Sequence, residues 1–267
     1  MLSVCSVNVN GIRAAQRRGG VDWLAEQSHD LVLLQEVRAS TEQLRACVTT
    51  LGDQHIAHAE SDQPGRAGVA IVSSLPLTDV REGLDGFERA GRWVEGTAET
   101  TIGPVRFASV YVHTGQADTP KQDEKYHFLR AMTLRLEALA AKHERVLVCG
   151  DLNIAHTPLD IRNAKGNVGK AGFLPAEQAY LSSWLEAGWV DLGRHHAGDV
   201  DGPYTWWTWR GQAFDRDVGW RIDYAHATPT LAAELRTVNV GRAASYAQRW
   251  SDHAPVVAQF SEQQAGR

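Results

Sequence analysis

Five short stretches of the chain place acids, amides or an imidazole directly beside apolar runs. They are SVNVNG with Asn8 and Asn10, LVLLQE with Glu36, VLVCGDLN with Asp151 and Asn153, GWRIDY with Asp223, and WSDH with Asp252 and His253. A carboxylate at the end of a buried strand costs free energy unless it is paired, solvated or bound to a metal. Each stretch alone also fits an ordinary polar loop or an Asn-Gly turn. Together they predict a site assembled from several strand ends.

Oxygen donors dominate this set of side chains. Carboxylates that crowd at one sheet edge repel each other, so some of them must hold a cation or share protons. Carboxylate and amide oxygens suit a hard ion such as Mg²⁺, with water completing its octahedron. The cysteines and histidines show no zinc-site spacing. We therefore expect four histidines to be ordinary surface or core residues: His55, His58, His195 and His196.

Alternating apolar runs and periodic runs must position these side chains. The short apolar runs predict strands over 2–9, 31–35, 69–73, 93–101, 105–112, 146–149, 221–227, 235–240 and 256–260. The periodic runs predict helices over 20–27, 41–51, 119–143 and 174–188. Thr119 and Pro120 have the residue types favoured at the start of the third helix. Gly150 is expected to turn the chain, so that Asp151 and Asn153 emerge on the same side.

The order of these elements does not suit a strict βαβ series. It predicts an α/β fold with mostly antiparallel, paired β-sheets and helices outside them. No linker, repeat or low-complexity tract interrupts the sequence, so we expect one domain over 1–267 with its core at about 2–261.

Composition narrows the class of protein further. An apolar fraction of 43% is ample for a packed core. The sequence has neither a long apolar run nor a secretory leader pattern, which predicts a cytoplasmic protein without a membrane span. Three cysteines without a C-x-x-C pattern, Cys5, Cys47 and Cys149, are expected to be buried thiols.

The charge pattern leaves nucleic-acid binding open. A net charge of −5 argues against binding a polyanion by bulk charge alone, but it allows a local basic face that works with a metal ion. Seven basic residues in expected loops or at helix starts could line one edge, and they could equally be scattered and solvated. They are Arg13, Arg17, Arg18, Lys121, Lys125, Lys165 and Lys170.

Several of these motifs occur together in one known family. LVLLQEVR, GDLNIAHTPLDI, YTWWTW followed by VGWRIDY, and WSDHAPV resemble the exonuclease III family of abasic-site endonucleases. That family lies within the wider endonuclease/exonuclease/phosphatase superfamily with DNase I. The resemblance runs in matching order from Val4 to about Phe260. It implies a four-layered α/β sandwich, in which two facing β-sheets are flanked by helices.

The resemblance also implies a mechanism, the hydrolysis of DNA phosphodiesters by in-line attack of water. Glu36 would be the main ligand of Mg²⁺, for which Mn²⁺ could substitute. Asp151 would align or deprotonate the water, and Asn153 would orient it. His253 would face the scissile phosphate, with Asp223 holding its ring in the charged form.

Further groups complete the catalytic and metal sets that the resemblance implies. Tyr111 would donate its hydroxyl to the phosphate, and Asn8 would hold Asp151 or a phosphate oxygen. Asn10 and Asp252 would lie in the metal region, Asp252 through water, and Asp151 and Asn153 would also belong to it.

The aromatic tract concerns the choice of substrate. In the resembling family, positions that match Trp206, Trp220 and Ile222 wall a small apolar pocket for a deoxyribose without its base. Trp207 is better explained as a core residue. We expect Arg194 and Arg210 near the DNA. The partner would be double-stranded DNA with abasic sites or 3′ ends, bound by a monomer in the cytoplasm at the nucleoid.

Other functions remain as alternatives. The motifs QE, GDLN and SDH would also serve a superfamily phosphoesterase that acts on inositol phosphates or phospholipid head groups, although the tract over 206–222 argues against it. A DNA-binding relative without catalysis is a third hypothesis, against which the intact acidic set argues. Thr114, the segment 191–194 and Asp217 depart from the family's usual residues, which puts the phosphate-gripping loop around Thr114 in doubt.

Overall fold

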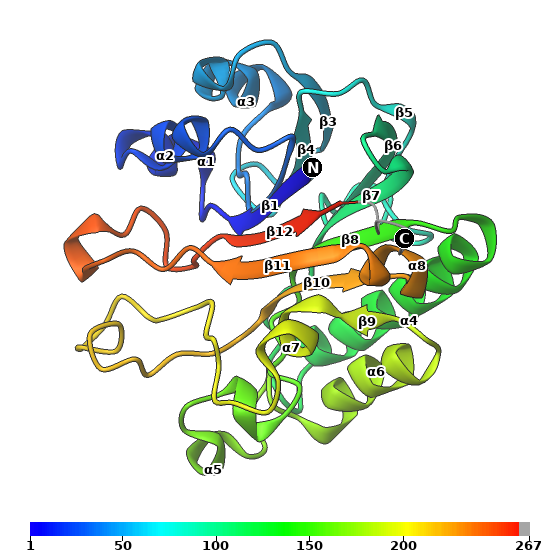
Figure 1. Cartoon of the computed structure of the whole chain (residues 1–267). Helices are drawn as coiled ribbons and strands as arrows, with labels where there is room; N and C mark the ends of the chain where they lie inside the picture. Colours follow the sequence, from blue (N-terminus) through cyan, green and yellow to red (C-terminus); the bar gives the residue numbers. More distant parts are fainter. Residues whose placement is uncertain (262–267) are drawn as a thin grey trace, which may run out of the picture.

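The computed structural model describes residues 1–261, and its centre is two six-stranded sheets that lie face to face (Figure 1). The last residues of the expected domain, 262–267, lie outside the described residues. In spatial order the first sheet contains β11 (Leu235–Val240), β12 (Val256–Phe260), β1 (Leu2–Asn8), β2 (Leu31–Gln35), β4 (Val69–Ser73) and β3 (His55–Ala59). The second contains β5 (Thr78–Glu82), β6 (Trp93–Thr100), β7 (Gly103–Tyr111), β8 (Val146–Asp151), β10 (Asp223–Ala227) and β9 (Val190–Asp191).

Strand pairing brings polar strand ends together. Among the described strands, β1–β2 and β7–β8 are parallel pairs and the remaining ladders are antiparallel, as the sequence predicts. The parallel β7–β8 register sets Tyr111 beside Asp151, and the antiparallel β8–β10 register sets Asp151 opposite Asp223. In the other sheet, Asn8 lies beside Gln35, the residue before Glu36. Both sheets therefore deliver polar side chains to one region.

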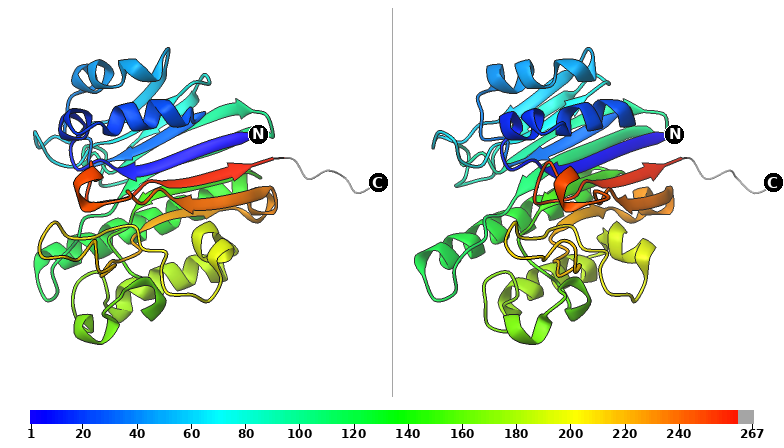
Figure 2. Two further views of the ribbon diagram at one scale, coloured as in Figure 1. Left: turned by 60° about the vertical axis from the view of Figure 1, so that its left-hand side comes forward. Right: turned by 90° about the vertical axis from the view of Figure 1, so that its left-hand side faces the viewer.

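Helices cover the outer face of each sheet, which makes the four layers that the resemblance implies (Figure 2). On the first sheet lie α1 (Ile12–Arg17), α2 (Gly20–Gln27) and α3 (Thr41–Cys47), packed through Ile12, Leu24 and Leu44. On the second lie α4 (Pro120–Lys142) and α6 (Pro175–Glu186). Shorter helices complete the described chain: α5 (Ala164–Asn167), α7 (Leu192–Ala197), α8 (Pro229–Ala233), and the 3₁₀ turns Thr49–Leu51, Pro158–Asp160 and Tyr246–Gln248.

The long helix α4 shows how sequence periodicity produces a layer. Phe128, Met132, Leu136 and Leu139 share one face at spacings of four, four and three, and all are buried against the second sheet. Pro120 occupies the first turn, where its missing N–H costs nothing. The inner faces of the two sheets meet in a separate apolar core that includes Leu31, Phe107 and Phe260.

Two expectations about strands near the site are corrected. The strand expected over 221–227 begins only at Asp223, because the backbone N–H groups of Ile222 and Asp223 donate to Thr205 Oγ1, each at 3.1 Å. Gly150 does not turn the chain but lies inside β8, where a Cβ atom would be 1.9 Å from the carbonyl oxygen of Val110. Only glycine allows β8 to lie this close to β7 and to carry Asp151 forward.

Other segments differ from the sequence prediction in smaller ways. The helix expected over 41–51 ends at Cys47, with the 3₁₀ turn Thr49–Leu51 following. The strands β3, β5 and β9 were not predicted, because their polar and short segments lack an apolar run. The three cysteines are buried and unpaired, as expected. Among the described helices, none combines the length and the apolar character needed to cross a bilayer.

Candidate active site

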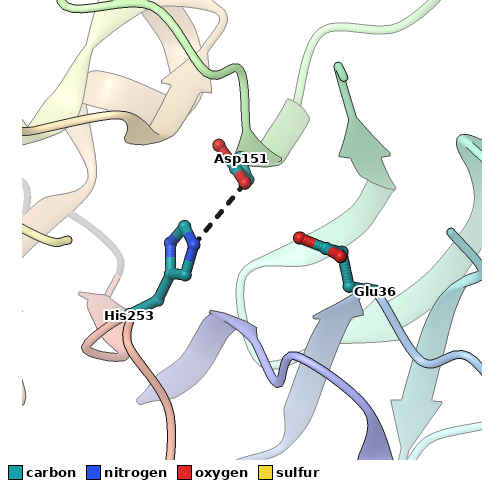
Figure 3. Close-up of side chains that lie close together, drawn as sticks. All are labelled: Glu36, Asp151 and His253. Atoms are coloured by element: carbon teal, nitrogen blue, oxygen red, sulfur yellow. Dashed lines mark ion pairs between the residues drawn. The ribbon is translucent and has the colours of Figure 1, made fainter. Parts of the chain in front are cut away.

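Three side chains from distant parts of the sequence converge at the junction of the two sheets. Glu36 follows β2, Asp151 ends β8 and His253 precedes β12. All three are buried, and one potential ligand atom from each lies within 4.8 Å of those of the other two. Figure 3 shows the three side chains pointing toward one another. The convergence that the sequence predicts for these residues is therefore present.

Asn8 joins the two acids of this group. Its side-chain amide donates to Glu36 Oε1 and to Asp151 Oδ2, both at 2.8 Å. Its side-chain oxygen Oδ1 accepts from the backbone N–H of Asn10 at 2.9 Å. The hydrogen bond from Asn8 to Asp151 favours the charged form of Asp151 and so opposes the effect of burial on its pKa. Of the two partners expected for Asn8, the described contacts show Asp151.

His253 lies between two aspartates. Its Nδ1 donates to Asp223 Oδ2 at 2.9 Å, and its Nε2 is 3.8 Å from Asp151 Oδ2. Burial alone would lower the pKa of His253, but the charges of Asp223 and Asp151 outweigh burial and raise this pKa. Burial raises the pKa of Asp151, and the charge of His253 opposes that effect. The site therefore favours an imidazolium whose ring orientation is set by Asp223.

The segment after β8 places Asn153 beside Asp151. Asn153 has a left-handed backbone with φ of 50°, and its N–H donates to Asp151 Oδ1 at 2.8 Å. Its side-chain amide donates to Asp151 Oδ2 at 3.0 Å and to the carbonyl of Val112 at 2.9 Å. Thr114 donates its hydroxyl to Asn153 Oδ1 at 3.3 Å. Asn153 is thus held by two chain segments with its polar group against the acid.

Tyr111 lies beside Asp151 in the β7–β8 pair, at the end of β7. Its pKa is raised by burial first and then by the charges of Glu36 and Asp151. The phenol therefore remains protonated and can act as a hydrogen-bond donor.

Asn10 and Asp252 pair with each other instead of joining the acidic group. Asn10 Nδ2 donates to Asp252 Oδ1 at 2.8 Å, and Trp206 Nε1 donates to Asp252 Oδ2 at 3.2 Å. Both carboxylate oxygens of Asp252 are therefore engaged. Asn10 and Asp252 nevertheless line the same cavity as Glu36 and Asp151.

Arg38 is a site residue that sequence reasoning missed. Its guanidinium forms an ion pair with Glu36 Oε2. Glu36 and Arg38 both have a left-handed backbone, with φ of 49° and 51°, and the N–H of Arg38 donates to the carbonyl of Ala67 at 2.9 Å. The position of Arg38 two residues after Glu36 did not predict this ion pair, because the contact depends on the left-handed backbone turn between the two residues.

The donor set fits a divalent cation. Glu36 and Asp151 supply hard oxygen donors, and the imidazole of His253 lies beside them. Within the described residues, Glu36 pairs with Arg38, and Asp151 lies beside His253. These two cations offset only part of the repulsion between the buried carboxylates. A hard ion near Glu36 would offset it, in competition with Arg38.

A cavity of about 280 Å³ opens beside the acidic group. The three predicted pocket residues, Trp206, Trp220 and Ile222, line it together with Ala171 and Gly172. The rings of Trp206 and Trp220 meet edge to face with centroids 6.1 Å apart. Trp207 is instead buried in a separate apolar cluster, as expected. The lining of the cavity thus combines aromatic rings with acidic, amide and imidazole side chains.

Arg194 and Arg210 are not among the residues that line this cavity. Arg194 forms an ion pair with Asp160 and donates to the carbonyls of Gly198 and Val200, each at 2.7 Å. Arg210 is exposed in the loop before β10. The structure therefore gives Arg194 a supporting contact within the fold and leaves Arg210 free at the surface.

Two hydroxyl groups support the site from behind, and neither was predicted. Ser251 donates to the carbonyl of Asn8 at 2.7 Å and accepts from the N–H of His253 at 3.2 Å. Thr205 accepts the two N–H groups that open β10 at Asp223. One indication of these residues was present in the sequence: Ser251 lies two positions before His253, and Thr205 directly precedes Trp206.

A second and larger cavity, of about 690 Å³, adjoins the site at Glu36 and Tyr111. Four arginines line it: Arg38, Arg66, Arg89 and Arg92. Arg92 pairs with Glu124 at 2.8 Å, whereas Arg66 and Arg89 are exposed. Four carboxylates, of Glu36, Asp62, Glu88 and Glu124, line the same cavity, so the exposed arginines stand in a mixed-charge surface. These arginines differ from the set of basic residues that the sequence suggested.

Comparison with known proteins gives consistent results. The model of the Endonuclease/Exonuclease/phosphatase family matches residues 5–253. The chain is 31% identical over 258 residues to the exodeoxyribonuclease of Bacillus subtilis, covering 96% of this chain and 98% of that protein. It is 32% identical over 259 residues to the DNA repair nuclease APEX1 of Danio rerio, covering 96% and 81%. The structure of an AP endonuclease from Archaeoglobus fulgidus superposes with a TM-score of 0.85 at 28% identity, covering 98% and 100%.

Proposed function

The chain belongs to the Endonuclease/Exonuclease/phosphatase family, and from this premise we propose the reaction that it catalyses. It is a nuclease of the exodeoxyribonuclease III and AP endonuclease type. Its substrate is double-stranded DNA: it hydrolyses the phosphodiester 5′ to an abasic site and removes nucleotides or blocking groups from 3′ ends. The observation that carries this proposal is the meeting of Glu36, Asp151 and His253 beside an aromatic-walled cavity.

The acidic group would hold a divalent cation, for which we propose Mg²⁺ with Mn²⁺ as a substitute. Glu36 would be the main ligand, with Asp151 and Asn153 nearby and Asn10 and Asp252 acting through water. When bound, the ion would neutralise charge on the phosphate and on the leaving oxygen. Asn8 keeps the two acids in place through its paired hydrogen bonds.

Asp151 is the base in this proposal. Its raised pKa makes its carboxylate able to take a proton from water near neutral pH. Asn153 contacts both oxygens of Asp151 and so fixes their direction. The same contacts leave Asn153 Oδ1 facing Thr114, where it can orient the attacking water.

His253 and Tyr111 stabilise the phosphate. Asp223 holds His253 Nδ1, so Nε2 carries its proton on the side of the cavity. A fixed imidazolium next to the scissile phosphate stabilises charge that develops during attack. The Tyr111 hydroxyl, which burial keeps protonated, donates a further hydrogen bond to the phosphate.

The cavity selects the substrate by shape. Trp206, Trp220 and Ile222 offer an apolar surface to a deoxyribose that has lost its base. A damaged site has neither stacking nor pairing, so turning it out of the duplex costs less than extruding an intact nucleotide. Arg66 and Arg89 at the adjoining cavity would bind neighbouring phosphates, and Arg210 would contact DNA from the surface.

We also propose that the chain is one domain that works as a monomer in the cytoplasm at the nucleoid. Free, buried cysteines suit a reducing compartment. Within residues 1–261, exposed large apolar side chains include Val80 on β5 and Leu134 on α4, which belong to different elements.

Product analysis on an end-labelled duplex with one abasic analogue tests the proposed function. We expect one cut on the 5′ side of the analogue, no cut in the presence of a chelator, and recovery on addition of Mg²⁺. Glu36→Ala should lose this activity. Turnover of a phosphoinositide head group with no cleavage of the abasic duplex would contradict the proposal and favour the other phosphoesterase function.

A further inference from the structure

A buried ion pair lies behind the polar wall of the cavity. Lys125 Nζ on α4 is 2.7 Å from Glu177 Oε1 on α6, and both side chains have an exposed fraction of 0%. The sequence suggested that Lys125 could line a basic edge, but the structure buries it completely. Burying two charges costs free energy that is regained only when their remaining hydrogen bonds are also satisfied.

Lys125 uses its ammonium group to join two loops. Besides the contact with Glu177, Nζ donates to the carbonyl of Asn153 at 2.9 Å and to the carbonyl of Thr114 at 3.1 Å. All three ammonium hydrogens can therefore be used. One of the two loops carries the side chain that contacts Asp151, and the other carries the hydroxyl that contacts Asn153.

Glu177 organises a third segment. Its Oε2 accepts from the backbone N–H of Gly172 at 2.7 Å and from that of Leu174 at 3.1 Å. Its Oε1 accepts from Gln122 Nε2 at 2.9 Å as well as from Lys125. Both carboxylate oxygens are thus saturated by donors, and the segment before α6 is tied to α4.

The three segments that this pair joins supply one side of the cavity. Thr114, Asn153 and Gly172 all line it. These segments are closely packed, since a Cβ atom on Gly172 would be 3.0 Å from the Trp220 ring and 3.1 Å from the carbonyl of Asn153. A small displacement of any of these segments would therefore change the cavity and the direction of the Asn153 side chain.

We propose that Lys125 and Glu177 are positioning residues for the nuclease reaction. Lys125 fixes the backbone that presents Asn153 to Asp151, and Glu177 fixes the Gly172 segment that bounds the substrate cavity. Neither residue touches substrate. This inference rests on the proposed function and extends it. Lys125 supports the rate of the chemical step, and Glu177 supports the recognition of the abasic residue.

Two variants separate positioning from stability. Lys125→Met removes the donors to Asn153 and Thr114 and leaves the charge of Glu177 uncompensated. Lys125→Met/Glu177→Gln removes that charge as well. In the double variant the introduced amide can still accept from Gly172 and Leu174 through its oxygen, and Gln122 can rotate to accept from its NH₂ group. The Gly172 side is therefore kept, while the Asn153 side is lost.

We expect kcat on the abasic duplex to fall about 100-fold in both variants, because small displacements of catalytic groups have effects of this size. KM should stay within about threefold of the wild-type value, since the contacts to Gly172 survive. The melting temperature should drop in Lys125→Met and recover in the double variant, while kcat does not recover. Lys142→Met on α4 and Glu186→Gln on α6, both at exposed positions, are the matched controls and should behave as wild type.

The outcomes are distinguishable. A kcat within threefold of wild type in both variants, or a kcat that recovers together with the melting temperature in the double variant, would overturn the positioning role. A wild-type protein that leaves the abasic duplex uncut would instead overturn the proposed function, and the positioning role with it, before any variant is compared.

Discussion

Asp151 and Asp223 face each other directly across the β8–β10 pair, so two buried carboxylates occupy neighbouring strands at the same level. The ring of His253 lies between them, with Nδ1 bonded to Asp223 and Nε2 3.8 Å from Asp151. An imidazolium in this place offsets the repulsion of the two acids. It also gives them different tasks, because only Asp223 is committed to holding the ring.

Asp223→Asn should therefore damage the site without changing its shape. The amide can keep a hydrogen bond to Nδ1 but no longer stabilises the charged ring, so the pKa of His253 should fall. We expect kcat on an abasic duplex to decrease about 100-fold, the size of effect seen when a transition-state donor is lost. The pKa of His253 can be followed by NMR. Asp215→Asn, at an exposed position, is the control, and an unchanged kcat and pKa in Asp223→Asn would refute the role of this pair.

Metal binding can be measured without any turnover. Calorimetric titration of the free protein with Mn²⁺ should show one strong site that Glu36→Gln weakens by at least about tenfold, because a charged ligand is replaced by a neutral one. Arg38→Gln should tighten binding roughly tenfold, which corresponds to removing about 1.4 kcal/mol of competition for Glu36. Equal affinity in wild type and Glu36→Gln would place the ion elsewhere.

The aromatic wall of the cavity should determine selectivity. Trp220→Ala removes the ring that meets Trp206 edge to face and enlarges the cavity. We expect the ratio of kcat/KM for the abasic duplex to that for an intact duplex to fall by about 10- to 200-fold, the range for loss of an apolar contact in a pocket. The intact duplex serves as the internal reference. A preserved ratio would mean that recognition occurs outside this cavity.

Two exposed arginines of the second cavity should contribute to the salt dependence of DNA binding. Arg66→Ala and Arg89→Ala each remove one exposed cation from its lining. If each binds one phosphate, the slope of log K against log salt should become shallower by about 0.9 per variant on duplex DNA. Fluorescence anisotropy between low and moderate salt measures this slope. Arg216→Ala, exposed and outside the cavity lining, should leave it unchanged.

The stability of the fold should depend on pH through a buried network of charges around Arg221. Arg221 Nε is 2.6 Å from Asp160 Oδ1, and Arg221 Nη1 is 2.8 Å from Asp191 Oδ2. Burial alone would raise the pKa of each carboxyl, but the charge of Arg221 outweighs it and lowers both below 3.8. Because the unfolded chain then binds protons more readily, this stabilisation is present above about pH 4 and is lost as the pH falls through the folded pKa values.

Denaturant unfolding at a series of pH values tests this network. The free energy of unfolding should fall below about pH 4 in wild type, and less steeply in Asp160→Asn. Arg221→Gln should cost about 3–5 kcal/mol at pH 7, as expected when one partner of a buried ion pair is removed. Arg216→Gln at the surface should stay within about 0.5 kcal/mol. An equal cost for both arginines would show that the network is dispensable.

The sequence by itself determined much of the framework. The strands over 31–35, 69–73, 235–240 and 256–260 were predicted with their observed bounds, because continuous or alternating apolar runs with polar flanks specify a buried extended segment. The helix α4 followed from its apolar spacing and Pro120. Glu36, Asp151 and His253 could be predicted as site residues because burying a polar group beside an apolar strand costs free energy unless it has a partner.

Only the tertiary structure decided which of these polar groups share one place. Asp252 accepts hydrogen bonds from Asn10 and Trp206. Arg194 forms an ion pair with Asp160, and Lys125 is buried in an ion pair with Glu177. Arg38 forms an ion pair with Glu36 because of a left-handed backbone turn that the neighbouring residues in the sequence did not predict. The physical reason is that periodicity reports which face of an element is buried, whereas the partner of a charged side chain depends on strand register and on backbone turns between segments far apart in the chain.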